Sequence, residues 1–209
     1  MILIGQYDSP FVRRVAVAMN LYGLAYEHWP WSVFGDAHRL AAYNPLRRVP
    51  TLLLDDGEVL IESMAILDHL DSQVEPAHRL ISSAGSDRRA ALRFCALATG
   101  LCDKLVSLVY ERVLHEQESE VWIARCTKQV ADVLVALEQD CATLGSPYWF
   151  GSAPGHADVA MACAMRLLAE AHPDVHAAGA WPALTAHSSR CEALPAFSNV
   201  VQRFNPPRG

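Results

Sequence analysis

The sequence contains no long hydrophobic run. Although 52% of its 209 residues are hydrophobic, no apolar segment reaches the roughly 18 residues that span a bilayer. The first residues, MILIGQY, lack both the basic flank and the long apolar stretch of a secretory signal peptide. We therefore expect a soluble, cytoplasmic protein with no membrane partner.

Cysteine is absent from the first 94 residues, so this half of the chain cannot carry out dithiol chemistry. The second half has cysteines in segments with helical patterns and no C-x-x-C pair, at Cys95, Cys102, Cys126, Cys141, Cys163 and Cys191. A cytoplasmic chain of this size does not need a disulfide framework. We expect buried, reduced thiols.

Net positive charge is also missing. The formal charge is −6, and the arginine pairs that begin at positions 13, 47 and 88 are short and scattered among acids. Nucleic-acid-binding proteins need a clustered basic surface, so we expect no nucleic-acid partner.

A complete metal-binding motif is missing as well. His172 and His176 in HPDVH have a ligand-like spacing, but Pro173 argues against an ordinary helix, and no third or fourth ligand is evident. We interpret this stretch as a surface connector and expect no metal.

Residues 1–73 alternate between short strand-like runs and helical patterns. Apolar residues recur on one helical face from Phe11 to Tyr22, and Gly23 can end that helix. Asp56-Gly57 suits a tight turn between two apolar runs, which predicts a hairpin over 51–62, and Ser63 lies near the N-cap of the next helix. With strands at ILIG and AYEHWPW and a short helix at DAHRLAAYN, the predicted order is βαβαββα.

The second half has a different character. Residues 75–86 are rich in Pro, Gly and Ser, and helical patterns without strand signals follow over 87–115, 117–144 and 156–172, with shorter helices from Trp181 and Pro195. We expect an α/β domain over 1–74, a linker over 75–86 and an all-helical domain over 87–209.

The stretch DSPFVRRV places Ser9-Pro10 at the start of the first helix. Serine at the N-cap and proline at the first helical position are the preferred pair, so a purely structural role explains them. A hydroxyl has two acceptor lone pairs and one proton, however, so Ser9 can cap the helix and still donate to a ligand.

Three stretches of the first half, YDSPFVRRV, NPLRRVPTL and ESMAIL, together resemble the cytosolic glutathione transferases, in particular the serine-type bacterial, tau and zeta-like branch. The resemblance extends over essentially the whole chain. It implies a thioredoxin-like N-terminal domain, a helical C-terminal domain and a homodimer. It also implies glutathione as cosubstrate and a small hydrophobic electrophile, as in detoxification.

The same resemblance assigns roles to residues. Ser9 would donate to the glutathione sulfur and, with the helix N-terminus, favour the thiolate. Val49 would pair with the cysteinyl backbone beside a cis bond to Pro50. Arg48 would meet the glycyl carboxylate, whereas the alternative is an exposed loop charge. Glu62 would contact the γ-glutamyl amino group, and Ser63 would hold its carboxylate, although a helix cap explains Ser63 equally well.

Two features complicate these roles. Asp8 is a carboxylate beside the proposed thiolate, which it would oppose unless it points away or pairs with Arg13 or Arg14. Those arginines are either solvated, or one of them offsets Asp8 and adds positive potential at the sulfur. Arg47 stands where many relatives have glycine, so the shape of this loop is open.

The acceptor substrate would lie between the two halves. By position, the candidates for the pocket wall are Tyr7, Phe11, Phe34, Leu105, Val109 and Tyr110, each of which can equally be core. Farther on, GHADV resembles the family's capping segment before a buried helix. Gly155 replaces the usual Ser or Thr there, and Asp158 is interpreted as structural.

Several functions remain compatible with this pattern. A glutathione S-transferase is the main interpretation. Glutathione-dependent isomerases, dehalogenases and peroxidases share the thiolate and differ in the electrophile site. A non-catalytic binding or regulatory relative is the alternative from another class, because fold does not fix function.

Overall fold

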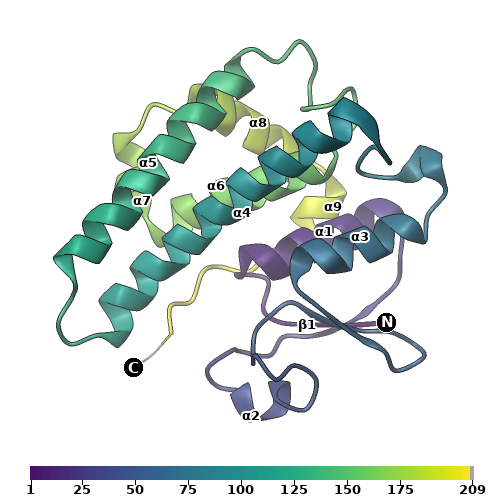
Figure 1. The fold of residues 1–209 in the computed structure, drawn as a ribbon, viewed down its shortest axis with the longest axis horizontal. Coiled ribbons are helices and arrows are strands. Elements are labelled where there is room, and N and C mark those ends of the chain that lie inside the picture. The colour runs from purple at the N-terminus through teal and green to yellow at the C-terminus, as the bar shows by residue number, and fades with distance from the viewer. Residues whose placement is uncertain (208–209) are drawn as a thin grey trace.

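The computed structural model describes residues 1–207, which form a small sheet with helices joined to a larger group of helices (Figure 1). The first half contains β1 (Ile2–Ile4), α1 (Pro10–Tyr22), β2 (Glu27–Trp29), α2 (Ala37–Leu40), β3 (Thr51–Leu53), β4 (Val59–Ile61) and α3 (Ser63–Ser72). The predicted order βαβαββα is confirmed.

The four strands form one mixed sheet in the order β2-β1-β3-β4. β1 runs parallel to β2, with Ile2 opposite Glu27, and antiparallel to β3, with Ile4 opposite Thr51. β3 and β4 form the predicted hairpin. α1 and α3 cover the face of the sheet that meets the helical half, and α2 lies on the opposite side (Figure 1).

The helical half follows a short 3-10 turn, η1 (Pro76–His78). Its helices are α4 (Gly85–Leu114), α5 (Glu120–Ala142), α6 (His156–Ala171), α7 (Pro173–Ala178), α8 (Pro182–Glu192) and α9 (Pro195–Ser198). The prediction of a connector around HPDVH is wrong, because Pro173 occupies the first position of α7, where its missing N–H costs nothing. His172 is buried, and its Nε2 lies 2.9 Å from the carbonyl oxygen of Leu105.

α6 lies at the centre of the helical half. It packs against α4 and α8 and also against α1 of the first half.

All six cysteines are buried and unpaired, as predicted, and burial raises the pKa of most of their thiols, that of Cys141 to about 11. No helix within residues 1–207 combines the length and apolarity needed to cross a membrane.

A buried polar cluster joins the two halves. The Asp71 carboxylate of α3 accepts hydrogen bonds from the Tyr22 hydroxyl and the Leu80 backbone N–H, and its Oδ2 lies 2.9 Å from Nε2 of His156 on α6. Burial alone would raise the pKa of Asp71, but these partners lower it. Burial lowers the pKa of His156, which favours the neutral imidazole beside the Asp71 carboxylate.

The N-terminus of α6 explains why glycine stands at position 155. A Cβ on this residue would lie 2.6 Å from the carbonyl oxygen of Leu80, which accepts a hydrogen bond from the His156 N–H. The Asp158 carboxylate accepts from the Gly155 N–H at 2.8 Å, so this half of the capping box remains.

Asp158 also connects α6 to its surroundings. It is fully buried, accepts a hydrogen bond from the Trp149 N–H, and lies 2.7 Å from Nε2 of His187. We expect Asp158→Asn to lower the free energy of unfolding by about 2 kcal/mol, because an amide has one acceptor oxygen where the carboxylate uses two. Urea unfolding measures this, and a variant as stable as the wild type would contradict the structural role.

Candidate functional site

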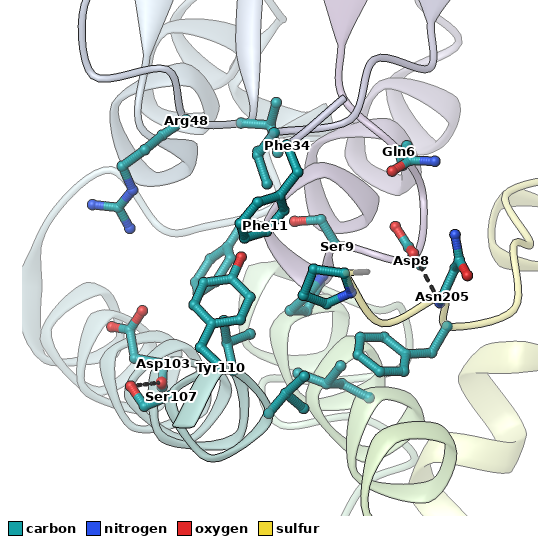
Figure 2. A pocket seen from close by; sticks show the side chains of 18 of the residues that line it. Gln6, Asp8, Ser9, Phe11, Phe34, Arg48, Asp103, Ser107, Tyr110 and Asn205 are labelled. Carbon is teal, nitrogen blue, oxygen red and sulfur yellow. Dashed lines mark hydrogen bonds between the residues drawn. The ribbon is translucent and has the colours of Figure 1, made fainter. Parts of the chain in front are cut away.

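The two halves enclose a cleft of about 700 Å³. One side is formed by the N-terminal end of α1 and by two loops of the first half, and the other by α4, α5 and the chain after α9 (Figure 2). Its lining includes Asp8, Ser9, Phe11, Phe34, Arg47, Arg48, Val49, Asp103, Lys104, Ser107, Val109, Tyr110, Trp122, Phe204, Asn205 and Pro207.

A second cavity of about 320 Å³ adjoins the cleft, because both are lined by Phe11, Arg48, Val49 and Asp103. The other residues of this cavity come from α1, the loop between α2 and β3, the end of β4, α3 and α4, and include Arg14, Asn44, Pro50, Glu62, Met64 and Thr99. A molecule with an extended charged part and a reactive end would span the two cavities.

Ser9 lies where the chain turns from the β1 loop into α1. Its hydroxyl oxygen accepts the Val12 N–H at 3.4 Å, so the predicted cap is confirmed. The side chain is half-buried and lines the larger cleft, where the labelled hydroxyl points toward Phe11 and away from Asp8 (Figure 2). The hydroxyl proton is therefore available to a ligand, next to the positive end of the helix dipole.

The loop before β3 has two unusual backbone features. The Val49–Pro50 peptide bond is cis, as the resemblance implies. Arg47 has a φ of 51°, in the left-handed region that favours glycine, so this loop has a glycine-type backbone although arginine occupies the position. Arg48 is exposed and lines both cavities.

The first residues of α3 differ from the prediction, which placed Ser63 at the N-cap. Glu62 occupies the cap position with a φ of 72°, and Ser63 is the first helical residue, with no capping hydrogen bond from its side chain. The Ser63 hydroxyl instead donates to the Glu62 carboxylate at 3.3 Å and accepts from the Arg14 guanidinium at 3.4 Å. Ser63 is buried, and Glu62 is exposed at the smaller cavity.

The two arginines of α1 are both 1% exposed, so the prediction that they are solvated is wrong. Arg13 makes a bidentate ion pair with Glu192 at 2.6 and 2.8 Å and donates to the carbonyl oxygens of Phe197 and Val200. It holds the chain around α9, and it does not offset Asp8.

Arg14 has a different environment. It contacts Ser63 and lines the smaller cavity, but its Nε and Nη2 have no hydrogen-bond partner within residues 1–207. Burial raises the pKa of the Cys95 thiol, and the Arg14 guanidinium opposes that effect. A buried guanidinium with unpaired nitrogens is costly, so this side chain favours an anion in the smaller cavity.

Asp8 pairs with neither arginine in the part of the chain that the structure describes. Its carboxylate accepts the backbone N–H of Asn205 at 3.1 Å, a contact drawn in Figure 2. Burial raises the pKa of Asp8, and the N–H groups of Asn205 and Ser9 counteract part of that shift.

Of the residues expected in the acceptor pocket, Phe11, Phe34, Val109 and Tyr110 line the larger cleft. The Phe34 and Tyr110 rings meet edge to face, with their centroids 5.5 Å apart.

The other two candidates, Tyr7 and Leu105, are not among the residues that line the larger cleft. Tyr7 faces away from the cleft. Its ring stacks on His28, and its hydroxyl forms a hydrogen bond with the Tyr26 hydroxyl. Burial and the contact with Tyr26 raise the pKa of Tyr7. Leu105 is fully buried in the helical core because its side of α4 faces α6.

Sequence reasoning missed several cleft residues. Asp103, Val106 and Ser107 precede the expected Tyr110 at helical spacing on α4, so this periodicity was a usable signal. Burial raises the pKa of Asp103, while Arg48 and Lys104 oppose that shift. Nothing in the sequence indicated the contribution of the chain after α9.

The structure offers no metal centre in the residues that it describes, because no three His, Cys, Asp or Glu side chains gather there. The charged groups at the cavities are instead arginine, lysine and carboxylates, and serine, threonine, tyrosine and amide side chains accompany them. These groups fit an anionic or zwitterionic organic ligand.

Comparison with known proteins gives a consistent result. Residues 3–78 match the family described as Glutathione S-transferase, N-terminal domain, and residues 120–190 match Glutathione S-transferase, C-terminal domain. The chain is 35% identical to a maleylacetoacetate isomerase of Pseudomonas aeruginosa, over 96% of this chain and 95% of that protein. It is 28% identical to Glutathione S-transferase U8 of Arabidopsis thaliana, over 76% and 67%.

Solved structures agree over the whole chain. A glutathione S-transferase from Methylobacterium radiotolerans, in complex with glutathione sulfonate, superposes with a TM-score of 0.89 at 27% identity and covers 100% of this chain and 97% of that one. A glutathione S-transferase from Methylobacillus flagellatus with glutathione bound gives 0.88 at 25% identity, over 95% and 98%.

Proposed function

Because the chain belongs to the glutathione S-transferase family, we propose that it binds glutathione in the smaller cavity, holds the sulfur as a thiolate at Ser9, and presents it to a small hydrophobic electrophile in the larger cleft. The thiolate sulfur forms a bond to the electrophilic carbon, and the leaving group departs with its bonding electrons. We also propose the domain limits 1–74 and 87–209, a homodimer and a cytoplasmic location, as in the family resemblance.

The observation that carries this proposal is the buried guanidinium of Arg14, a residue that lines the smaller cavity. Its two unpaired nitrogens match the two oxygens of a carboxylate, which arginine binds with parallel hydrogen bonds. The Ser63 hydroxyl lies beside the guanidinium and adds a further group for that carboxylate. Glutathione has a carboxylate at each end, and its γ-glutamyl end would lie here.

The remaining polar groups suit the rest of the tripeptide. Glu62 is exposed at the same cavity and would attract the γ-glutamyl amino group. Arg48, which lines both cavities, would meet the glycyl carboxylate, and the Val49 main chain would pair with the cysteinyl backbone between them. The sulfur would then enter the larger cleft at Ser9.

The larger cleft supports an apolar acceptor. Phe11, Phe34, Val109, Tyr110 and Trp122 contribute apolar and aromatic surface. Such walls desolvate the thiolate and the electrophile together, which strengthens the contribution of each hydrogen bond to the sulfur.

A second candidate is a glutathione-dependent isomerase, favoured by the 35% identity to a maleylacetoacetate isomerase. In that reaction the thiolate adds to a double bond, rotation follows, and the sulfur leaves again. Glutathione is therefore regenerated. Incubation with glutathione and an unsaturated diacid, followed by mass spectrometry, separates the two activities, because only a transferase yields an adduct and consumes glutathione.

Retention on immobilised glutathione tests the proposal first. We expect the protein to be retained and eluted by free glutathione, and ultraviolet titration of the complex to show a thiol that ionises below its usual pKa of about 8.5. Absence of binding would contradict the proposal and favour a non-catalytic relative.

Glu62 gives a more specific test. We expect Glu62→Gln to weaken glutathione binding about fivefold in calorimetry, a modest effect because the carboxylate is exposed. The matched control is a glutathione analogue without the α-amino group, which the wild type and the variant should bind equally. Unchanged affinity for glutathione itself would remove Glu62 from the site.

A further inference from the structure

We propose that Asp8 is a positioning residue that holds the C-terminal strap, residues 201–207, closed against the acceptor cleft, so that the strap determines which electrophiles fit. The inference rests on the proposed function. In this proposal Asp8 acts by holding the strap, whereas the sequence alone indicated only an unfavourable negative charge beside the sulfur.

Backbone and side-chain contacts fasten the strap at successive points. The Gln202 side-chain oxygen accepts the Tyr7 N–H at 3.0 Å. The Glu170 carboxylate of α6 accepts the Phe204 N–H at 2.6 Å, and the Asp8 carboxylate accepts the Asn205 N–H at 3.1 Å. The contact to Asp8 is the one nearest Ser9 in sequence.

The strap is a wall of the cleft. Phe204, Asn205 and Pro207 line it together with Ser9 and Pro10, and Figure 2 shows Asn205 and Asp8 side by side next to Ser9. In Figure 1 the chain after α9 passes the N-terminal end of α1 on its way to the C-terminus. Displacement of the strap would enlarge the cleft at the end where the sulfur enters.

The strap has a fixed base. Arg13 donates to the carbonyl oxygens of Phe197 at 3.1 Å and Val200 at 2.8 Å, and its ion pair with Glu192 keeps the guanidinium in place. Beyond Val200 the chain has no regular secondary structure up to residue 207. Beyond this base the strap is held by the hydrogen bonds of Gln202, Phe204 and Asn205 and by the packing of Phe204 against the helical core.

The chemistry of Asp8 supports this role. A carboxylate next to a thiolate opposes its ionisation, so such a residue needs a compensating function. The Asp8 carboxylate is partly buried and directed at a backbone N–H of the strap. Any side chain with an acceptor oxygen at this position, charged or neutral, can accept this N–H.

Three variants of the full chain separate the strap from the charge. Asp8→Ala removes both the acceptor and the charge, Asp8→Asn removes the charge but keeps one acceptor oxygen, and Glu170→Gln changes the neighbouring fastening on α6 while retaining an acceptor. A fourth protein, ending at Arg203, lacks most of the strap.

Hydrogen exchange of the free protein tests the fastening without any ligand. We expect the amides of residues 201–205 to exchange about tenfold faster in Asp8→Ala, and close to the wild-type rate in Asp8→Asn and Glu170→Gln. Equal exchange in the wild type and Asp8→Ala would overturn the proposal. Since this measurement needs no glutathione, it stays decisive even if the proposed transferase activity fails.

Steady-state kinetics tests specificity, with a single-ring nitroaryl chloride and a bulkier fused-ring aryl halide as electrophiles. We expect Asp8→Ala to raise KM for the small electrophile about fivefold. The difference in KM between the small and the bulky electrophile should become smaller, and the affinity for glutathione should stay the same. Asp8→Asn should have the KM of the wild type. Both variants remove the negative charge and so lower the pKa of the glutathione thiol, which means that a difference in KM between them comes from the strap. Truncation at Arg203 should reproduce Asp8→Ala without adding to it. Equal KM effects of Asp8→Ala and Asp8→Asn, or additive effects with truncation, would contradict the strap mechanism.

Discussion

Ser9→Ala will lower the rate of glutathione conjugation by about 10²-fold and raise the pKa of the bound thiol by one to two units. The hydroxyl at the start of α1 is half-buried in the cleft and has a proton to donate, because its oxygen accepts the Val12 N–H. Loss of one preorganised donor to an anion typically costs two to three orders of magnitude in turnover. Ultraviolet titration of the complex and the pH profile of the rate measure both effects.

The same substitution also removes a helix cap, which costs about 1 kcal/mol of stability, so capping and catalysis have to be separated. Ser9→Gly is the matched control, because glycine at the N-cap costs only a few tenths of a kcal/mol. We expect the glycine variant to be nearly as stable as the wild type and as inactive as the alanine variant, whereas Ser9→Thr keeps a hydroxyl and most of the activity. A glycine variant with wild-type activity would show that Ser9 only caps the helix.

The local order of the first half was predictable because its signals are local. The apolar face from Phe11 to Tyr22, the left-handed Gly23 and the Asp56-Gly57 turn each determine the backbone within a few residues. α7 was missed because Pro173 both ends one helix and begins another, and the sequence pattern does not distinguish these roles.

The cleft was less predictable because its residues are brought together by long-range contacts. Leu105 and Tyr110 are five positions apart on α4, yet one faces the core and the other the cleft, which depends on how α6 packs against the helix. The environment of Asp8 depends on Asn205, almost two hundred positions along the chain. No periodicity reports a contact of that kind.

The adjacent arginines illustrate the same limit. Arg13 and Arg14 are neighbours in sequence and equally buried, but α1 directs them to different sides. Arg13 meets Glu192 and two carbonyl oxygens, whereas Arg14 meets Ser63 and the smaller cavity. Their chemistry follows from which helices cover each side of α1, so the two residues should respond in opposite ways to the same substitution.

Arg14→Met will weaken glutathione binding by about 10²- to 10³-fold and at the same time stabilise the free protein by about 1 kcal/mol. A hydrogen-bonded pair of buried charges loses several kcal/mol when one partner is removed, which accounts for the affinity. In the free protein the guanidinium is buried with two nitrogens unpaired, so an apolar side chain of similar length is the better occupant. Calorimetry with glutathione and urea unfolding without it measure the two effects.

Two controls identify the carboxylate that Arg14 binds. Arg13→Met should destabilise the fold, because it leaves Glu192 and the carbonyl oxygens of Phe197 and Val200 without their donor. A glutathione analogue without the γ-glutamyl α-carboxylate should bind equally to the wild type and to Arg14→Met, whereas an analogue without the glycyl carboxylate should still distinguish them. If Arg14→Met binds glutathione as tightly as the wild type does, the anion does not lie at this guanidinium. A gain in stability with a loss of affinity would mean that this chain keeps a costly buried charge because the ligand uses it.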